Sequence, residues 1–296
     1  MAIPESQLDT WSHQGSITQS SSTYLTIKNA LEANDSTYTN KNYKVFLQGS
    51  YGNDTNIYSE SDVDIIIRLD SIFRHDLENL PQNQKDAFQK AFEDSTYSCK
   101  QFKTEVSAQL ISKFGSSTRL RGKAIKIDAF GSRRSADVVA AAKFRRYHKF
   151  LSVNDQNYDE GIYFFNAQGE IILNYPQQHS QNCTNKNKAT NSWFKPMVRI
   201  LKNMRSKLVD EKIIESSTSP SYYIEGLLFN VPNEKFGSNY VDTFVNSINW
   251  IYDQDRSKFV CANEQYYLLY KDSNTSWDPS NCDEFLNAVV ELWKQW

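Results

Sequence analysis

Apolar positions along the chain follow two periodicities, and together they predict a mixed α/β protein. Short apolar runs bounded by turn residues are typical of buried strands. Such runs occupy residues 45–47, 63–69, 124–129 and 136–140, and two more, 162–165 and 171–173, flank a turn that contains Gly169. Apolar residues at helical spacing occur at 24–31, 82–113, 193–207, 222–229, 240–251 and 282–296. We therefore expect a sheet with flanking helices in the first half and a helical second half.

Polar signals set the expected boundaries of elements and domains. Ser20, Ser21 and Ser22 offer N-caps for the first helix, because a serine hydroxyl accepts hydrogen bonds from the exposed N–H groups of a helix start. The segment from Tyr175 to Lys188 is polar and is expected to lack a helix. We place a domain boundary there, which divides the chain into residues 1–175 and 176–296.

The composition is that of a folded protein without a membrane segment. The chain has 296 residues, of which 39% are hydrophobic and 14% aromatic, enough for two lobes that share a cleft. No apolar run approaches the roughly 20 residues that cross a bilayer, and the N-terminus lacks the features of a signal peptide. We expect a cytoplasmic protein that does not bind a membrane and has free thiols. His179 and Cys183 have metal-like spacing, but the sequence places no second ligand pair nearby.

Charge is unevenly distributed along the chain. The formal net charge is −2, yet residues 119–149 carry ten Lys/Arg against two Asp, and residues 186–207 carry seven Lys/Arg and no acid. A duplex-binding protein is usually basic overall. Basic segments in an otherwise acidic chain suit a small polyanion such as a nucleoside triphosphate, although solvated helix faces would give the same pattern.

Asp62 and Asp64 are the strongest candidates for chemistry. They open the second apolar strand at spacing i, i+2, which puts both side chains on one face of a strand. Adjacent carboxylates repel unless a cation lies between them, and Mg²⁺ prefers oxygen ligands. Gly49 and Ser50 end the preceding strand, where backbone N–H groups and a hydroxyl can hold a triphosphate. The alternative for such a pair is an exposed strand edge with solvated charges.

A third carboxylate is expected, because two-metal phosphoryl transfer needs a ligand near the attacking hydroxyl. The candidates are Asp128 and Asp137. Asp137 stands in an apolar run, where a carboxylate is costly unless it is paired or binds a metal, so we favour it. A salt bridge to Arg133, Arg134 or Arg145 would be the structural alternative.

These motifs together resemble a known family. Gly-Ser-x(11)-Asp-x-Asp resembles the signature of the DNA polymerase β-like nucleotidyltransferase superfamily. The order Gln48-Gly49-Ser50, Ala136-Asp137-Val138-Val139, the run 194–202 and Ser221-Tyr222 is similar to bacterial cGAS/DncV-like nucleotidyltransferases, the synthases of cyclic di- and trinucleotide second messengers. The resemblance implies an α+β fold: a polymerase β-like core, with a mixed sheet flanked by helices, and a C-terminal helical lobe across a central cleft.

The resemblance also implies roles for individual residues. Asp62 and Asp64 hold two ions, Mg²⁺ or Mn²⁺, and Asp137 holds the catalytic one. Gln48, Gly49 and Ser50 contact the donor nucleotide, with Ser50 on its terminal phosphates. From the helical lobe, Lys202 and Ser221 reach the triphosphate and Tyr222 stacks on the donor base. The alternatives are a solvated lysine and a core tyrosine.

The implied activity is synthesis of a cyclic oligonucleotide from nucleoside triphosphates such as ATP or GTP, with release of pyrophosphate. The implied partner is an effector protein that responds to the product in anti-phage defence. We expect a monomer without stably bound nucleic acid. The alternative is a nucleotidyltransferase that acts on an RNA end, a protein or a small-molecule hydroxyl, and an RNA substrate would call for a longer basic track. The intact Asp-x-Asp argues against a non-catalytic binding module.

Overall fold

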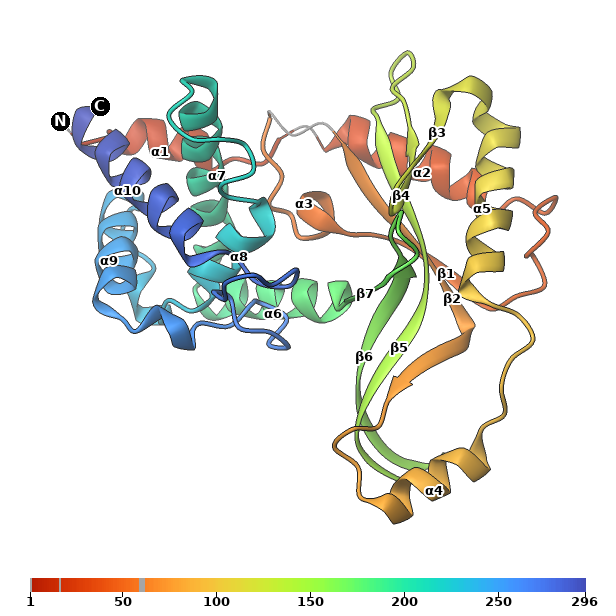
Figure 1. Ribbon diagram of the computed structural model, residues 1–296. Helices are drawn as coiled ribbons and strands as arrows, with labels where there is room; N and C mark the ends of the chain where they lie inside the picture. Colours follow the sequence, from red (N-terminus) through yellow and green to blue (C-terminus); the bar gives the residue numbers. More distant parts are fainter. Residues whose placement is uncertain (1, 16, 59–61) are drawn as a thin grey trace. The chain divides into compact units, whose positions relative to one another are not determined.

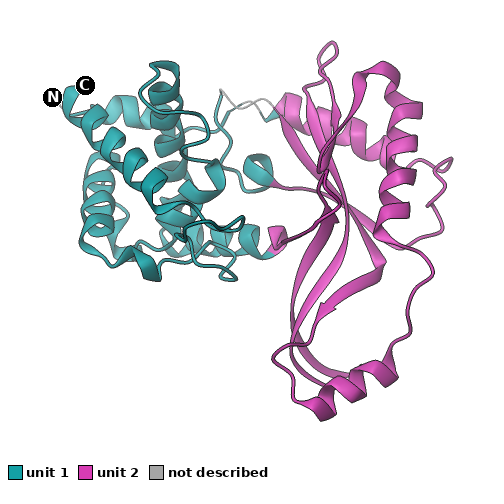
Figure 2. Ribbon diagram, in the orientation of Figure 1, with its two compact units in different colours: residues 1–17, 49–60, 178–296 teal, residues 18–48, 61–177 magenta. Residues whose placement is uncertain are grey.

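The computed structural model describes residues 2–15, 17–58 and 62–296. The chain divides into two compact units, and each is discontinuous in sequence (Figure 2). Unit 1 comprises residues 1–17, 49–60 and 178–296, and unit 2 comprises residues 18–48 and 61–177. The domain boundary expected between residues 175 and 176 stays a prediction.

Unit 2 is built on a seven-stranded mixed sheet (Figure 1). Its strands are β1 (Tyr43–Leu47), β2 (Val63–Asp76), β3 (Thr118–Arg121), β4 (Ala124–Ile127), β5 (Ala136–Ser152), β6 (Asp155–Phe165) and β7 (Ile171–Asn174). The order is β1-β2-β5-β4-β3, with β6 pairing β5 and β7 pairing β6. β2 and β5 run parallel, and the other pairs are antiparallel. The mixed sheet and the expected hairpin of residues 162–173 are thus confirmed.

Three helices, α2, α4 and α5, pack on the sheet and bury its apolar side chains. α2 (Thr18–Leu31) and α5 (Cys99–Phe114) contact strands β1, β2, β3 and β5, and the 3₁₀ helix η1 (Gly115–Ser117) follows α5 (Figure 1). α4 (Gln82–Ala91) packs on β5, where Phe88 meets Tyr147 and Phe150. Because β2 is central, the consecutive Ile65, Ile66 and Ile67 are all fully buried.

One expected helix boundary in unit 2 was wrong. The helix expected at residues 24–31 begins at Thr18, so the three serines 20–22 lie inside α2 rather than at its cap. The helical periodicity of residues 82–113 corresponds to two helices, α4 and α5. α5 starts after Ser98, whose side chain and that of Gln101 form a reciprocal capping box, and this local cap separates α5 from α4.

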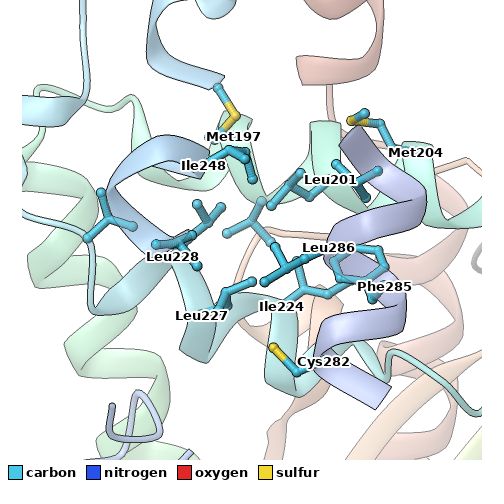
Figure 3. Packing of buried hydrophobic residues seen from close by; sticks show 14 of the residues in the cluster. Met197, Leu201, Met204, Ile224, Leu227, Leu228, Ile248, Cys282, Phe285 and Leu286 are labelled. Carbon is cyan, nitrogen blue, oxygen red and sulfur yellow. The ribbon is translucent and has the colours of Figure 1, made fainter. Parts of the chain in front are cut away.

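Unit 1 is helical. Its elements are α1 (Glu5–Ser12), α3 (Gly49–Gly52), α6 (Pro176–Ala189, which begins in unit 2), α7 (Phe194–Asp210), α8 (Ser221–Phe229), α9 (Tyr240–Asp253) and α10 (Pro279–Gln295), with 3₁₀ helices η2 (Asn233–Lys235) and η3 (Arg256–Lys258). α7, α8, α9 and α10 share one apolar core, in which residues such as Leu201, Leu227, Ile248 and Phe285 interlock (Figure 3). The expected helical second half is confirmed.

The expectation that residues 175–188 lack a helix was wrong, because this segment forms most of α6. Its sequence is polar, with many Asn and Gln, and carries little apolar periodicity. His179 and Cys183, one helical turn apart, are nevertheless buried. Packing against the rest of unit 1 therefore stabilises a helix that local preferences alone do not predict. Among the helices of the described residues, none combines the length and apolar character that a bilayer-spanning helix needs.

Candidate active site

Asp62 and Asp64 lie at the start of β2 in unit 2. β2 begins at Val63, so Asp62 immediately precedes the strand and Asp64 is its second residue. The intervening Val63 is fully buried, and strand alternation puts the two carboxylates on the opposite face from it. The Asp62 Oδ1 accepts a hydrogen bond from the Ser135 hydroxyl, and Nζ of Lys126 lies 3.3 Å from Oδ2. Asp62 is thus held by its own chain on both carboxylate oxygens.

Asp137 is the second residue of β5 and stands directly beside Asp64. In the parallel pairing of β2 with β5, Asp64 and Asp137 are register partners, so their side chains share a face. The pKa of Asp137 is raised, first by burial, while Lys126 lowers it and the neighbouring charge of Asp62 raises it. The structure therefore brings the three predicted carboxylates to one end of adjacent strands.

Asp128, the other candidate, is engaged elsewhere. It follows the last residue of β4, and Oδ2 of Asp128 is 2.7 Å from Nε of Arg119. The salt bridges considered for Asp137 are not formed among the described residues. Arg133 donates to the Asp128 carbonyl, and Arg145 lies over the ring of Phe73. Asp137 is therefore placed beside Asp64, whereas Asp128 is paired with Arg119.

The Gly-Ser turn forms the short helix α3 of unit 1. Gly49 has φ of 63°, a backbone conformation that favours glycine. The carbonyls of Gly49 and Ser50 accept hydrogen bonds from the N–H groups of Asn53 and Thr55 at 3.0 and 2.9 Å. Gln48, the last residue before the turn, belongs to unit 2, and its N–H donates to the Asp64 carbonyl at 3.0 Å. The chain therefore enters the turn from β1, the strand that pairs with β2.

A buried carboxylate on α8 holds this turn in place. Glu225 is 2% exposed, and it accepts hydrogen bonds from Asn53 Nδ2 at 3.0 Å, from the Thr55 hydroxyl and from His179 Nε2 at 2.5 Å. Burial alone would raise the pKa of Glu225. The His179 hydrogen bond and the charges of His179 and Lys202 outweigh burial, so its pKa lies below the ordinary value. Sequence reasoning missed Glu225, although a single acid in an apolar run was the signal that identified Asp137.

Three basic residues of α7 also anchor the segment after α3. Lys202 is fully buried and its Nζ donates to the Thr55 carbonyl at 2.8 Å. Lys195 Nζ lies 2.9 Å from Asp54 Oδ2, and Arg199 Nη1 donates to the Asp54 carbonyl at 2.6 Å. Part of the positive charge in residues 186–207 is therefore used within the protein, to hold the chain that carries Ser50.

Ser221 and Tyr222 form the first turn of α8. The Ser221 hydroxyl accepts a hydrogen bond from Arg205 Nη1 at 3.1 Å. Tyr222 stacks on the His179 ring, with centroids 4.8 Å apart, and its hydroxyl accepts a hydrogen bond from Asn263 Nδ2. Burial raises the pKa of Tyr222, so this hydroxyl stays protonated. Lys202, Ser221, Tyr222 and the Gly-Ser turn therefore all belong to unit 1, whereas the three aspartates belong to unit 2.

His179, Cys183 and Glu225 need separate consideration as a metal site. One ligand atom from each lies within 4.8 Å of the others, and all three residues are buried. The Glu225 carboxylate already has three hydrogen-bond donors. The chemistry of this cluster fits an internal anchor for the turn better than a metal centre.

The chain is similar to known proteins over its whole length. Residues 181–294 match the family model of the cGAS/DncV-like nucleotidyltransferase C-terminal helical domain. The chain is 37% identical to the cyclic UMP-AMP synthase of Rhodothermus marinus, over 100% of this chain and 99% of that protein. It is 36% identical to the cyclic nucleotide synthase CdnE01 of Staphylococcus haemolyticus, over 100% of both. The solved structure of the Rhodothermus marinus CdnE c-UMP-AMP synthase with Apcpp and Upnpp is similar, with a TM-score of 0.89 and 36% identity over 99% of this chain and 97% of that one.

Proposed function

The chain belongs to the cGAS/DncV-like nucleotidyltransferase family, and from this premise we propose that it joins two nucleoside triphosphates into a cyclic dinucleotide with release of pyrophosphate. The observation that carries the proposal is the set of three carboxylates at one end of β2 and β5, with Asp64 and Asp137 in register. The chain continues from β1 into the Gly-Ser turn. The full-length similarity to a cyclic UMP-AMP synthase supports a cyclic product.

The carboxylates suit two divalent cations, Mg²⁺ or Mn²⁺. The three carboxylates offer hard oxygen donors at the same end of neighbouring strands, and Asp62 raises the pKa of Asp137, a repulsion that a bound cation would relieve. Asp62 and Asp64 would hold both ions, and Asp137 would hold the one at the acceptor hydroxyl. When bound there, such ions lower the pKa of the attacking ribose hydroxyl and offset the negative charge of the transition state.

The Gly-Ser turn and its neighbours would bind and orient the donor nucleotide. Gln48, which follows β1 in unit 2, would contact it, as would Gly49 and Ser50 of unit 1. The hydrogen bonds that anchor Asn53, Asp54 and Thr55 would hold the turn in one conformation, so that nucleotide binding costs little conformational entropy. We propose a phosphate contact for Ser221 and base stacking for Tyr222. For Lys202 we propose that its charge acts on the phosphates while its Nζ supports the turn through Thr55.

We further propose that the product is a second messenger. It would be made in the cytoplasm by a monomer and recognised by an effector protein in anti-phage defence, as in the family that the motifs resemble. A cyclic product suits this role, because it has no terminal phosphate for a phosphatase to remove.

Incubation with all four nucleoside triphosphates and Mg²⁺ or Mn²⁺, followed by phosphatase and mass spectrometry, tests the proposal. We expect a phosphatase-resistant cyclic dinucleotide, and we expect the Asp62→Asn/Asp64→Asn double variant to fold but form none, since neutral amides bind Mg²⁺ poorly. Addition of a nucleotide only to an RNA end, a protein side chain or a small hydroxyl compound would overturn cyclic synthesis. More than a few per cent of activity in the double variant would overturn the assignment of the metal ligands.

A further inference from the structure

Lys126 lies among the carboxylates proposed as metal ligands. It sits on β4, and its Cα is the register partner of Asp137 on β5. Lys126 Nζ is 3.3 Å from Asp62 Oδ2. Of the nearby cations, Lys126 is the one that acts most strongly on Asp137, ahead of Lys123 and Arg121. One ammonium therefore interacts with two of the three carboxylates.

The position of Lys126 follows from the sheet. Lys126 lies two residues beyond Ala124, on the face of the sheet where Ala124, Ile66 and Val139 pack together. Asp64 and Asp137 precede Ile66 and Val139 by two residues, so they lie on that same face. The Lys126 side chain is 24% exposed, which limits its freedom without removing it from solvent. Ser135 donates to the other Asp62 oxygen, so both oxygens of this carboxylate already have partners.

We propose that Lys126 competes with the divalent cations for Asp62 and thereby makes metal binding depend on the nucleotide. This inference rests on the proposed function, because the metal ligands are the ones assigned there. Two cations that share a carboxylate repel each other, so a metal ion on Asp62 must either displace the ammonium or bear its repulsion. A triphosphate offers anionic oxygens that a lysine ammonium binds well. Metal and nucleotide then bind cooperatively, each favouring the other.

A purely structural role for Lys126 predicts the opposite change in metal affinity when Lys126 is removed. If Lys126 only fixes the orientation of Asp62, its removal leaves a looser ligand and weakens metal binding. If Lys126 competes, its removal strengthens metal binding in the absence of nucleotide. Metal affinity, measured apart from turnover, therefore distinguishes the two roles.

The test is a Mn²⁺ titration without nucleotide, in which free Mn²⁺ is followed by electron paramagnetic resonance. We expect Lys126→Gln to bind Mn²⁺ about threefold to tenfold more tightly than the wild type, in keeping with a partly exposed charge pair. Lys126→Arg keeps the charge and should stay within about twofold of the wild type. Lys123→Gln is the matched control, since Lys123 is exposed and forms no ion pair with Asp62 in the described residues, and it should change affinity by less than about twofold.

A non-hydrolysable ATP analogue should reduce the difference in Mn²⁺ affinity between the wild type and Lys126→Gln, because the Lys126 ammonium of the wild type then binds a phosphate instead of Asp62. Equal or weaker Mn²⁺ binding by Lys126→Gln than by the wild type, including binding undetectable in both, would overturn the inference. If the analogue left the difference in Mn²⁺ affinity unchanged, the link to nucleotide would be overturned.

Failure of the proposed function itself would give other results. Mn²⁺ binding unaffected by Asp62→Asn/Asp64→Asn would reject the metal ligands themselves, and absence of a cyclic product would reject the synthase while the Lys126 effect on Mn²⁺ remained.

Discussion

Glu225 shows how a single buried carboxylate can hold a turn in position. It contacts no proposed substrate group, and its three donors come from the segment after α3 and from α6. Each of these polar groups is buried, so each needs its partner. The negative charge is balanced by His179 and Lys202. Removal of that charge would leave the buried Lys202 ammonium without compensation, which is more costly than loss of an exposed pair.

Glu225→Gln should therefore lower the free energy of unfolding by about 3–5 kcal/mol and raise the KM for nucleoside triphosphates. Urea unfolding and initial-rate kinetics measure the two effects. Glu284→Gln, at an exposed position of α10, is the matched control and should change neither. An unchanged KM in a Glu225→Gln protein that is folded at the assay temperature would contradict the positioning role.

The pH dependence of stability gives Glu225 an independent signature. Because its folded pKa lies below the ordinary value of 4.5, the unfolded chain binds the proton first. The stabilisation is present above pH 4.5 and is lost as the pH falls through the lowered pKa. Wild-type stability should thus fall more steeply in acid than that of Glu225→Gln, and equal slopes would argue against an ionised Glu225.

Asp137 and Asp128 can be separated by one pair of variants. Asp137→Ala should abolish synthesis of the cyclic product, whereas Asp128→Ala should keep much of it, because Asp128 is paired with Arg119. The raised pKa of Asp137 means that folding disfavours its charged form. Asp137→Ala should therefore unfold at the same temperature as the wild type or above it. The opposite pattern of activity would place the third ligand on Asp128.

At the scale of elements, α6 depends on its surroundings. Its sequence from Pro176 to Ala189 has low helix preference, and its buried side chains are His179 and Cys183. A synthetic peptide of residues 175–190 should therefore be mostly unstructured in water by circular dichroism, since isolated helices of this length are marginal even with favourable sequences. A strongly helical peptide would show that local preference, and not packing, stabilises α6.

The elements also show how far the sequence predicts this site. β1, β2 and β5 are predictable because short apolar runs have few alternatives, and Asp137 is predictable because its charge interrupts such a run. The register of Asp64, Asp137 and Lys126 is set by pairing between strands that are far apart in the sequence, which no local pattern encodes. The anchors on Asn53 and Thr55 likewise depend on contacts made in the folded chain.

At the scale of the whole molecule, many basic residues are matched by acids. Within residues 119–149, Arg119 pairs with Asp128, Lys126 with Asp62 and Lys149 with Asp155. These ion pairs reduce the positive charge available for phosphates along a duplex, and non-specific DNA binding needs several such contacts. Duplex DNA at 0.15 M salt should therefore change the rate of product formation by less than about twofold. Clear activation by DNA would contradict this expectation.

The order of the segments in unit 1 determines which contacts can form first while the chain is being synthesised. Thr55 and Glu225, which the structure joins by a hydrogen bond, are 170 residues apart in the sequence. A ribosome that adds about 5–20 residues per second needs roughly 10–30 seconds to make that stretch. During this interval a nascent chain can pair β1 with β2, but the turn between them has no α8 to hold it. The strands β1 and β2 can thus form early in synthesis, whereas the turn between them gains its contact with Glu225 late, and a chain interrupted before α8 lacks that contact.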